Sequence, residues 1–239
     1  MNRASFWLTV VSVNWGRGYD PGEFKANVMR VLKFTGGREH VVILPQELDE
    51  EPDPAKEHPQ FARMLEPGSR RVHWHTREPI ILSPGFKVTR RRKRQTMGSG
   101  QQIDGRLEGI GPERLAISCT AELEGVSLAF LNTHPHRNMP EHPEVQRARQ
   151  HGVDVMADEL ARLRAFDGGT SGVWGADMND SSIPQLVAGE RLGNRRGLDH
   201  LRYWSHPDGA HLELKDRGSL KGTIDPHDPI WIRLLVTGR

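Results

Sequence analysis

Short apolar segments that end abruptly in polar residues recur along this chain, and they constrain its fold more than any other feature. The apolar run at residues 6–13 is followed at once by Asn14, and the run at 41–44 leads into Gln46 and Glu47. Continuous apolar runs of this length are typical of strands buried on both faces and are too short for buried helices. The pattern predicts layered strands whose ends carry the polar chemistry.

Helical segments alternate with these strands. From Pro21 onward, apolar side chains follow at three- and four-residue spacing, which predicts an amphipathic helix with proline in its first turn. Residues 144–166 show similar spacing and predict the longest helix. Further strands are expected at residues 80–82, 86–88, 115–123, 126–132, 173–175 and 230–236, with a hairpin turn at Glu124 and Gly125.

Composition excludes several classes of protein. The 239 residues suit one large domain, and 36% hydrophobic with 27% charged residues is an ordinary globular profile, neither disordered nor membrane-spanning. No run approaches the roughly 20 apolar residues of a membrane span. The single cysteine, Cys119, excludes an intrachain disulfide and a multi-cysteine zinc site. We expect a single domain over residues 1–239 of an intracellular, cytoplasmic protein.

One segment stands apart by its charge. Five consecutive cations precede a stretch rich in Gly and Gln, namely Arg90, Arg91, Arg92, Lys93 and Arg94. Such runs are often only solvated faces, but consecutive cations can also form an electrostatic footprint for nucleic acid. We expect these five residues to bind nucleic acid from a mobile basic and glycine-rich loop at about residues 90–111.

Polar motifs continue at the ends of the later strands. His134 ends a polar triplet that follows an apolar strand. Asp177 and Asn179 are two residues apart, which would direct both side chains to the same side of an extended segment. Asp199 and His227 stand in two further polar motifs. A carboxylate at the end of a buried strand is costly to bury unpaired, and it suits a hard cation such as Mg²⁺.

The order of these motifs resembles the endonuclease/exonuclease/phosphatase superfamily. The resemblance covers nearly the whole chain through Asn14, Gln46-Glu47, Asn132-Thr133-His134, Gly175-x-Asp177-x-Asn179, Leu198-Asp199-His200 and His227-x-Pro229-Ile230. Any one of these motifs is common by chance, whereas six in order form a specific match. The resemblance implies an α/β (α+β) fold: a four-layer sandwich in which two mostly antiparallel β-sheets pack face to face with helices outside.

The resemblance also implies roles for individual residues. Glu47 would be the principal ligand of Mg²⁺, or of Mn²⁺ in its place, with Asn14 close by and Asp225 as a further ligand. Asp177 and Asn179 would position the attacking water and the scissile phosphate. The cation would neutralise charge on the phosphate oxygens, as hydrolysis of a phosphodiester requires.

Two histidines complete the implied site. His227 would act as a base or stabilise phosphate charge, with Asp199 orienting its imidazole. His134 would donate to a phosphate or leaving oxygen, and Glu78 is a candidate partner for its ring. A histidine near its unperturbed pKa of about 6.5 can serve as acid or base near neutrality.

One position departs from the family pattern. The family usually has Asp directly before the histidine that corresponds to His227, and this chain has Pro226 at that position. Asp225 and Asp228 flank the Pro226-His227 pair, and proline restricts the residue before it to extended conformations. Either carboxylate could replace the missing ligand, and we expect Asp225 to do so.

The implied function is that of a metal-dependent phosphoester hydrolase, with nucleic acid as its expected substrate and partner. A nuclease acting on DNA or RNA is favoured by the basic run and by the excess of arginine over lysine. One alternative is a phosphatase or phosphodiesterase for a small phosphorylated molecule or lipid head group. A second alternative is a catalytically silent binding module with the same fold.

Overall fold

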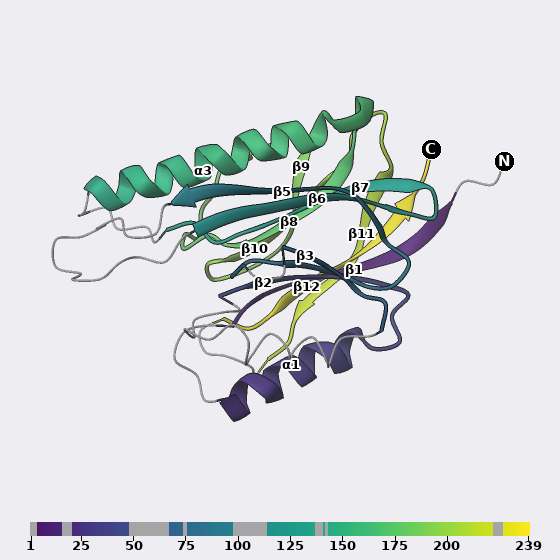
Figure 1. The fold of residues 1–239 in the computed structure, drawn as a ribbon, viewed down its shortest axis with the longest axis horizontal. Coiled ribbons are helices and arrows are strands. Elements are labelled where there is room, and N and C mark those ends of the chain that lie inside the picture. The colour runs from purple at the N-terminus through teal and green to yellow at the C-terminus, as the bar shows by residue number, and fades with distance from the viewer. Residues whose placement is uncertain are drawn as a thin grey trace.

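The chain folds into a four-layer sandwich (Figure 1). Two six-stranded sheets pack face to face, α3 (Pro143–Arg164) covers the outer face of one, and α1 (Pro21–Thr35) covers the other. The structure, a computed structural model, describes residues 4–15, 21–47, 67–73, 76–97, 114–136, 141, 143–221 and 227–239. None of the helices in these ranges is long and apolar enough to cross a membrane.

Both sheets are mostly antiparallel. The first has the order β11 (His211–Ser219), β12 (Ile230–Thr237), β1 (Ser5–Asn14), β2 (His40–Gln46), β4 (Ile80–Leu82) and β3 (Arg70–Val72). The second has the order β5 (Lys87–Met97), β6 (Arg114–Leu123), β7 (Val126–Thr133), β8 (Ser171–Asp177), β10 (Asp199–Trp204) and β9 (Glu190–Arg196). A short 3-10 helix, η1 (Phe166–Gly168), follows α3.

Each sheet has one parallel pair, and in both sheets that pair is the central one. β1 runs parallel to β2 in the first sheet, and β7 runs parallel to β8 in the second. The amide of Gln46, at the end of β2, donates to Asn132 Oδ1, near the end of β7, over 2.7 Å. This bond crosses between the sheets, so the carboxyl ends of the two parallel pairs meet at the same edge of the sandwich.

The alternation of side chains along the strands builds the core between the sheets. In β12 every second residue is buried, and Leu234 faces inward together with Val10 and Leu44 from the same sheet. Ile117 and Phe130 face them from the second sheet. Burying a side chain of this size contributes about 1.5–3 kcal/mol, so the inter-sheet layer supplies a large share of the folding free energy.

Each helix buries one apolar stripe on its sheet. Met156 and Leu160 of α3 pack with Trp174 of β8 in a second apolar cluster. Val28 and Val31 of α1 belong to a third cluster with residues of β1 and β2. The strands of the central pairs are therefore covered on both faces, as their unbroken apolar sequences predicted.

Most of the expected elements are confirmed, including the β6–β7 hairpin that turns at Glu124 and Gly125. The basic run at residues 90–94 lies within strand β5 and not in a loop, because its backbone pairs with β6 along its length. Residues 98–113, the rest of the expected loop, lie outside the described residues. The sequence reading missed β3, β9, β10 and β11, of which β9 and β11 are largely exposed.

Candidate active site

The polar residues at the strand ends converge at the edge where the parallel pairs finish. Asn14 ends β1, and Glu47 directly follows β2. His134 directly follows β7, and Asp177 ends β8. Asp199 begins β10, and His227 lies three residues before β12. We call these residues, together with Asn179, the strand-end cluster.

Asp177 is held by three neighbours. Its Oδ2 accepts a hydrogen bond of 2.8 Å from Asn14 Nδ2, which joins the two sheets. Its Oδ1 accepts the backbone N–H of Asn179 at 2.9 Å, and His134 Nε2 lies 3.5 Å from Oδ2. The bond to Asn179 closes an Asx turn, so the carboxylate of Asp177 is fixed by its own chain as well as by the opposite sheet.

Asn179 reaches the cluster through this turn, not through the extended segment that its spacing from Asp177 suggested. Its φ of 52° lies in the left-handed region, which Asn tolerates better than most residues. Its side-chain nitrogen lies 2.9 Å from His134 Nε2 and donates to the carbonyl of Pro135. The turn therefore places the Asn179 amide beside Nε2 of the His134 ring.

Glu47 also has an unusual backbone conformation. Its φ is 55°, a conformation that costs a residue with a side chain roughly 1–2 kcal/mol. Its side chain is almost fully buried, with Oε1 3.2 Å from His134 Nδ1 and 3.7 Å from Nη1 of Arg114. Strain of this kind at a buried carboxylate is characteristic of functional sites.

Arg114 is a member of the site that the sequence reading missed. It begins β6, is 8% exposed, and places Nη1 2.6 Å from His134 Nδ1. Its position opposite Met97 in the sheet brings it to the same edge as the strand-end cluster. No motif marks it in the sequence, because its contact with His134 depends on the pairing of β6 with β7.

His227 and Asp199 form a second hydrogen-bonded pair. Nδ1 of His227 lies 3.0 Å from Asp199 Oδ2 and 3.8 Å from Asp177 Oδ2. Burial, with a smaller contribution from the charge of Asp177, raises the pKa of Asp199 to about 6, although the hydrogen bond from His227 lowers it. Burial alone would lower the pKa of His227, but the bond to Asp199 and the charges of Asp199, Asp177 and Glu47 raise it overall.

This arrangement fits a divalent cation. Glu47, Asp177 and Asp199 are 7%, 2% and 3% exposed, and among the described residues Arg114 is the one arginine or lysine that forms an ion pair with any of them. Burying several carboxylates with so little compensating charge is costly. Ligand atoms of Asp177, Asp199 and His227 also lie within 4.8 Å of one another, close enough to share an ion. The donors are mostly oxygens, which suit Mg²⁺ or Mn²⁺.

Beneath the cluster, a polar network fixes the distance between the sheets. Gln46 Nε2 donates to Asn132 Oδ1 and, at 3.1 Å, to Ser12 Oγ. Asn132 Nδ2 donates to the carbonyls of Pro45 and Pro79 at 2.6 and 2.8 Å. Gln46 and Asn132 are fully buried, and their amides support the backbone that presents Glu47.

Two expected assignments stay predictions. Glu78 is fully buried directly before Pro79 and β4, and its expected pairing with His134 remains untested. Asp225 lies outside the described residues. Its competitor Asp228 pairs with Arg196 over 2.6 Å, an interaction that occupies its carboxylate.

The basic run is divided between two faces of β5. Arg92 and Arg94 turn toward α3, where each lies 3.8 Å from a carboxylate, of Glu159 and Asp158 respectively. Arg91 and Lys93 are exposed, and their charges add to the effect of burial in lowering the pKa of His73. The fifth member, Arg90, stacks on the ring of Phe166 at 5.2 Å.

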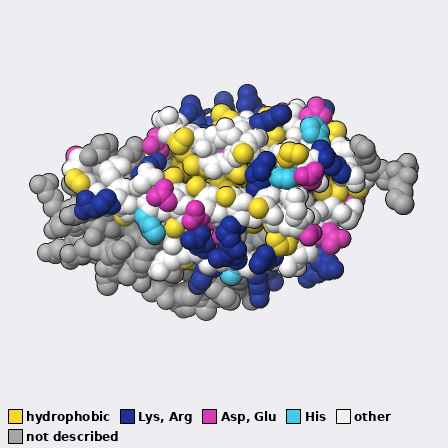
Figure 2. Space-filling view, turned by 90° about the horizontal axis from the view of Figure 1, so that it is seen from above, with side chains coloured by type: hydrophobic (Ala, Val, Ile, Leu, Met, Phe, Trp, Pro, Cys, Tyr) yellow, Lys and Arg dark blue, Asp and Glu magenta, His cyan; other side chains and the backbone are white. Residues whose placement is uncertain are grey.

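Seen from the α3 side, the surface carries Lys and Arg side chains in several separate groups, with a strip of hydrophobic side chains between them (Figure 2). The described part of this face therefore offers cationic patches and not one continuous basic surface. Three of the five cations of the basic run also serve the packing of α3 and η1 on the sheet. Arg91 and Lys93 are the two that remain exposed without such a contact to α3 or η1.

Comparison with known proteins gives no match at the level of sequence families. No family model matches the chain. No curated protein matches it in sequence either. The likeness lies in the fold.

Solved structures match the fold over almost the whole chain. An endonuclease/exonuclease/phosphatase family protein from Bacteroides thetaiotaomicron matches with a TM-score of 0.66 and 12% identity, covering 98% of this chain and 96% of that one. The human Nocturnin catalytic domain with bound sulfate matches with a TM-score of 0.63 and 12% identity, covering 98% of both chains.

A third match is the inositol polyphosphate 5-phosphatase domain of SPsynaptojanin, in complex with inositol (1,4)-bisphosphate and calcium ion. Its TM-score is 0.63 at 13% identity, and the match covers 99% of this chain and 85% of that one. At such low identities the likeness shows the fold and not the activity. The chain therefore has the same fold as these solved structures, the two-sheet sandwich that the order of its motifs implied.

Proposed function

We propose that this chain is a divalent-metal-dependent phosphoester hydrolase. The observation that carries the proposal is the convergence of buried carboxylates, two imidazoles and two amides at one edge of the sandwich. These groups come from strand ends of both sheets and are far apart in the sequence. Three buried carboxylates at one edge of the sandwich destabilise the fold, and such a cost is typical of a functional site.

Glu47 is the proposed principal metal ligand, with Asn14 and Asp225 as further ligands. The hydrogen bond from Asn14 Nδ2 to Asp177 fixes the orientation of the Asn14 amide. When bound, Mg²⁺ or Mn²⁺ would neutralise charge on the phosphate oxygens and lower the pKa of a bound water. The protein's contribution is to hold these oxygens in place before the substrate arrives.

His227 and Asp199 are the proposed pair for proton transfer. A hydrogen bond from His227 Nδ1 to Asp199 fixes the tautomer of the ring, so that Nε2 can accept a proton from water or donate to a phosphate oxygen. The His227 side chain is 16% exposed whereas that of Asp199 is 4% exposed. The imidazole is therefore the member of the pair that substrate can reach.

His134, Asn179 and Asp177 are proposed to orient the phosphate and the attacking water. The two nitrogens of His134 lie beside Arg114 and Asn179, so the ring is held on both sides. Each carboxylate oxygen of Asp177 accepts a hydrogen bond. These two bonds fix the orientation of the carboxylate. Arg114 adds the permanent positive charge that a phosphate dianion or diester requires beside its metal.

Nucleic acid is the substrate class that we propose. The exposed cations Arg91 and Lys93 lie on the strand next to β6, whose first residue Arg114 belongs to the site. A backbone of repeated phosphates could contact both places at once. Binding through such contacts should weaken steeply as the salt concentration rises.

A small phosphorylated molecule or lipid head group is the second candidate. The ion pairs of Arg92 and Arg94 with α3 favour it, because they withdraw two cations from any nucleic-acid surface. Such a substrate would contact only the strand-end cluster, so its turnover should depend little on Arg91 and Lys93.

The test is cleavage of labelled single- and double-stranded DNA and RNA, beside a panel of small phosphoesters, with Mg²⁺, Mn²⁺ or EDTA. Metal-dependent hydrolysis that is lost in Glu47→Gln and in His227→Ala would establish the proposed activity. An Arg91→Ser/Lys93→Ser variant is compared with Arg30→Ser/Lys33→Ser, whose exposed cations lie on α1 at the opposite outer face.

Each substrate class predicts a different result. For a nuclease, only the β5 pair of substitutions weakens nucleic-acid binding and reduces its salt dependence. For a small-molecule phosphatase, both double variants keep wild-type turnover and nucleic acid is not cut. Absence of hydrolysis of every substrate with every metal would overturn the proposal and leave the catalytically silent module.

A further inference from the structure

A second group of metal-ligating side chains lies at the end of the sandwich opposite the strand-end cluster. His40 begins β2 and Glu39 precedes it, while Glu124 lies in the β6–β7 turn. We call Glu39, His40 and Glu124 the distal cluster. β2 runs from His40 to Gln46, so the two clusters are roughly 20 Å apart along the strand.

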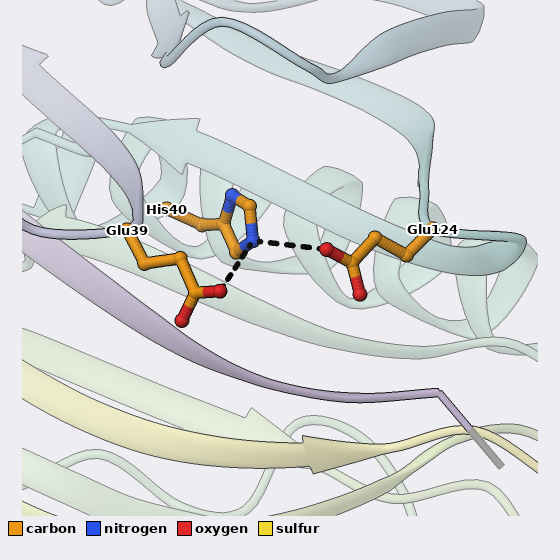
Figure 3. A group of neighbouring side chains, drawn as sticks. All are labelled: Glu39, His40 and Glu124. Atoms are coloured by element: carbon orange, nitrogen blue, oxygen red, sulfur yellow. Dashed lines mark ion pairs between the residues drawn. The ribbon is translucent and has the colours of Figure 1, made fainter. Parts of the chain in front are cut away.

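Both carboxylates of the distal cluster are directed at one nitrogen of the imidazole (Figure 3). His40 Nε2 lies 3.7 Å from Glu39 Oε1 and 3.6 Å from Glu124 Oε1. These distances are too long for hydrogen bonds. They are close to the separation of about 3.4 Å between ligand atoms that surround a tetrahedral ion at about 2.1 Å.

The imidazole is mostly buried and fixed in orientation. Its side chain is 12% exposed, and neither ring nitrogen has a hydrogen-bond partner among the described residues. The rings of Phe6 and Phe86 pack edge-on against it, with centroids 5.2 and 6.4 Å away. A buried nitrogen without a partner, held by aromatic walls toward two carboxylates, is arranged for a ligand that the protein itself does not supply.

Glu124 occupies a position that glutamate does not favour. It has a φ of 50° and Gly125 a φ of 77°, the pattern of a two-residue hairpin turn in which Asn-Gly or Asp-Gly is preferred. The chain thus has a longer side chain at a left-handed position, where its carboxylate reaches His40. This choice is explained if the carboxylate has a role that a short turn residue could not fill.

We propose that Glu39, His40 and Glu124 form a second metal site, for a borderline transition ion such as Zn²⁺, which links the two sheets. One imidazole and two carboxylates, with water in the fourth position, match the ligand types of zinc, whereas Mg²⁺ prefers oxygen ligands alone. His40 belongs to the first sheet and Glu124 to the second. The bound ion would hold the two sheets together at the end of the sandwich opposite the Gln46–Asn132 network.

The experiment separates this site from the strand-end cluster. It uses the full chain with Glu47→Gln and Asp177→Asn, so that the strand-end cluster loses two of its buried carboxylates, in excess Mg²⁺ at about pH 8, where histidine is neutral. Zinc stoichiometry and affinity are measured by equilibrium dialysis, coordination by the visible spectrum of the Co²⁺ form, and stability by thermal unfolding. Into this background we introduce Glu39→Gln, Glu124→Gln and Glu124→Asn.

Glu213→Gln is the matched control, because Glu213 is a strand carboxylate of similar exposure, 48% against 46% for Glu124. It lies on β11, three strands away from β2 in the same sheet. We expect one Zn²⁺ per chain in the background and in the control, with a tetrahedral Co²⁺ spectrum and a raised Tm. Either glutamine substitution weakens zinc binding by at least about 10-fold.

Glu124→Asn keeps the test decisive even if the glutamine variants fold poorly. Asn suits the left-handed turn, so the zinc-free Tm should rise while the gain in Tm on adding Zn²⁺ disappears. A background protein that binds no Zn²⁺ would overturn the proposal. Equal zinc affinity in Glu124→Asn and Glu213→Gln would overturn it as well.

Discussion

The two ends of this sandwich carry similar groups in opposite surroundings. The strand-end cluster includes Asp177, Asp199 and His227, whose side chains are 2%, 4% and 16% exposed. Asp199 is hydrogen-bonded to His227, and Asp177 to Asn14. In the distal cluster the carboxylates are 53% and 46% exposed, and the imidazole of His40 is 12% exposed. Charges that are exposed cost little, whereas charges that are buried together must be held there by the rest of the fold.

This contrast explains why the buried polar network lies at the end of the sandwich that holds the strand-end cluster. Gln46 and Asn132 cross between the sheets below the strand-end cluster, and Asn14 joins Asp177 across the same gap. Hydrophobic contacts alone would allow small shifts between the sheets, but buried amides have discrete partners. We therefore expect substitutions at the strand-end cluster to change activity strongly, and equivalent substitutions at the distal cluster to leave it unchanged.

The largest effect is expected for Asp177→Asn. This change removes a charge but keeps the shape, and the activity should fall by about 10³-fold because the fixed carboxylate no longer orients water and phosphate. The measurement is kcat/KM for the phosphoester that the wild type hydrolyses. Glu124→Gln is the matched control, and loss of activity in that variant would contradict the separation of the two clusters.

A second large effect is expected for the His227–Asp199 pair. His227→Ala should lower kcat/KM by about 10²–10³-fold, in the range of general acid–base catalysis. Asp199→Ala should have a smaller effect, and the double variant should be no worse than His227→Ala alone, because the carboxylate acts through the imidazole. Additive losses in this double-mutant cycle would show that the two residues act independently.

Stability should respond most to the network between the sheets. Asn132→Ala leaves the carbonyls of Pro45 and Pro79 and the amide of Gln46 without their buried partner. We expect a loss of about 2–3 kcal/mol in the free energy of unfolding, measured by urea denaturation in EDTA. An equal loss on truncating the exposed Glu124 would erase the difference between the two ends of the molecule.

The smallest effect is a gain in stability at neutral pH. Burial raises the pKa of Asp199 to about 6, above its unfolded value of about 3.9, so the folded state holds this proton more tightly. In EDTA this carboxyl therefore makes the protein less stable as the pH rises from about 4 to about 6. Asp199→Asn should gain about 1 kcal/mol at pH 7 and lose this slope. If the free energy of unfolding of the variant fell with pH as steeply as that of the wild type, another group would be responsible for the pH dependence.

Particular residues show how far the sequence alone could lead. The apolar runs before Asn14 and Glu47 predicted strands buried on both faces, and β1 and β2 are such strands. Edge strands β9 and β11 escaped notice because exposed strands need no apolar pattern. The basic run was predicted to lie in a loop because five consecutive charges give no alternating pattern, although β5 pairs with β6.

The sequence by itself determined the alternation of strands and helices, the position of polar residues at strand ends, and the order of motifs that implied the fold. Those features depend on neighbours in the chain, which local pattern records. Only the tertiary structure decided that Arg114 lies beside His134, that Glu47 adopts a left-handed conformation, and that Glu124 meets His40. The contact of Arg114 with His134 depends on the pairing of β6 with β7, and that of Glu124 with His40 exists only once the two sheets have packed together.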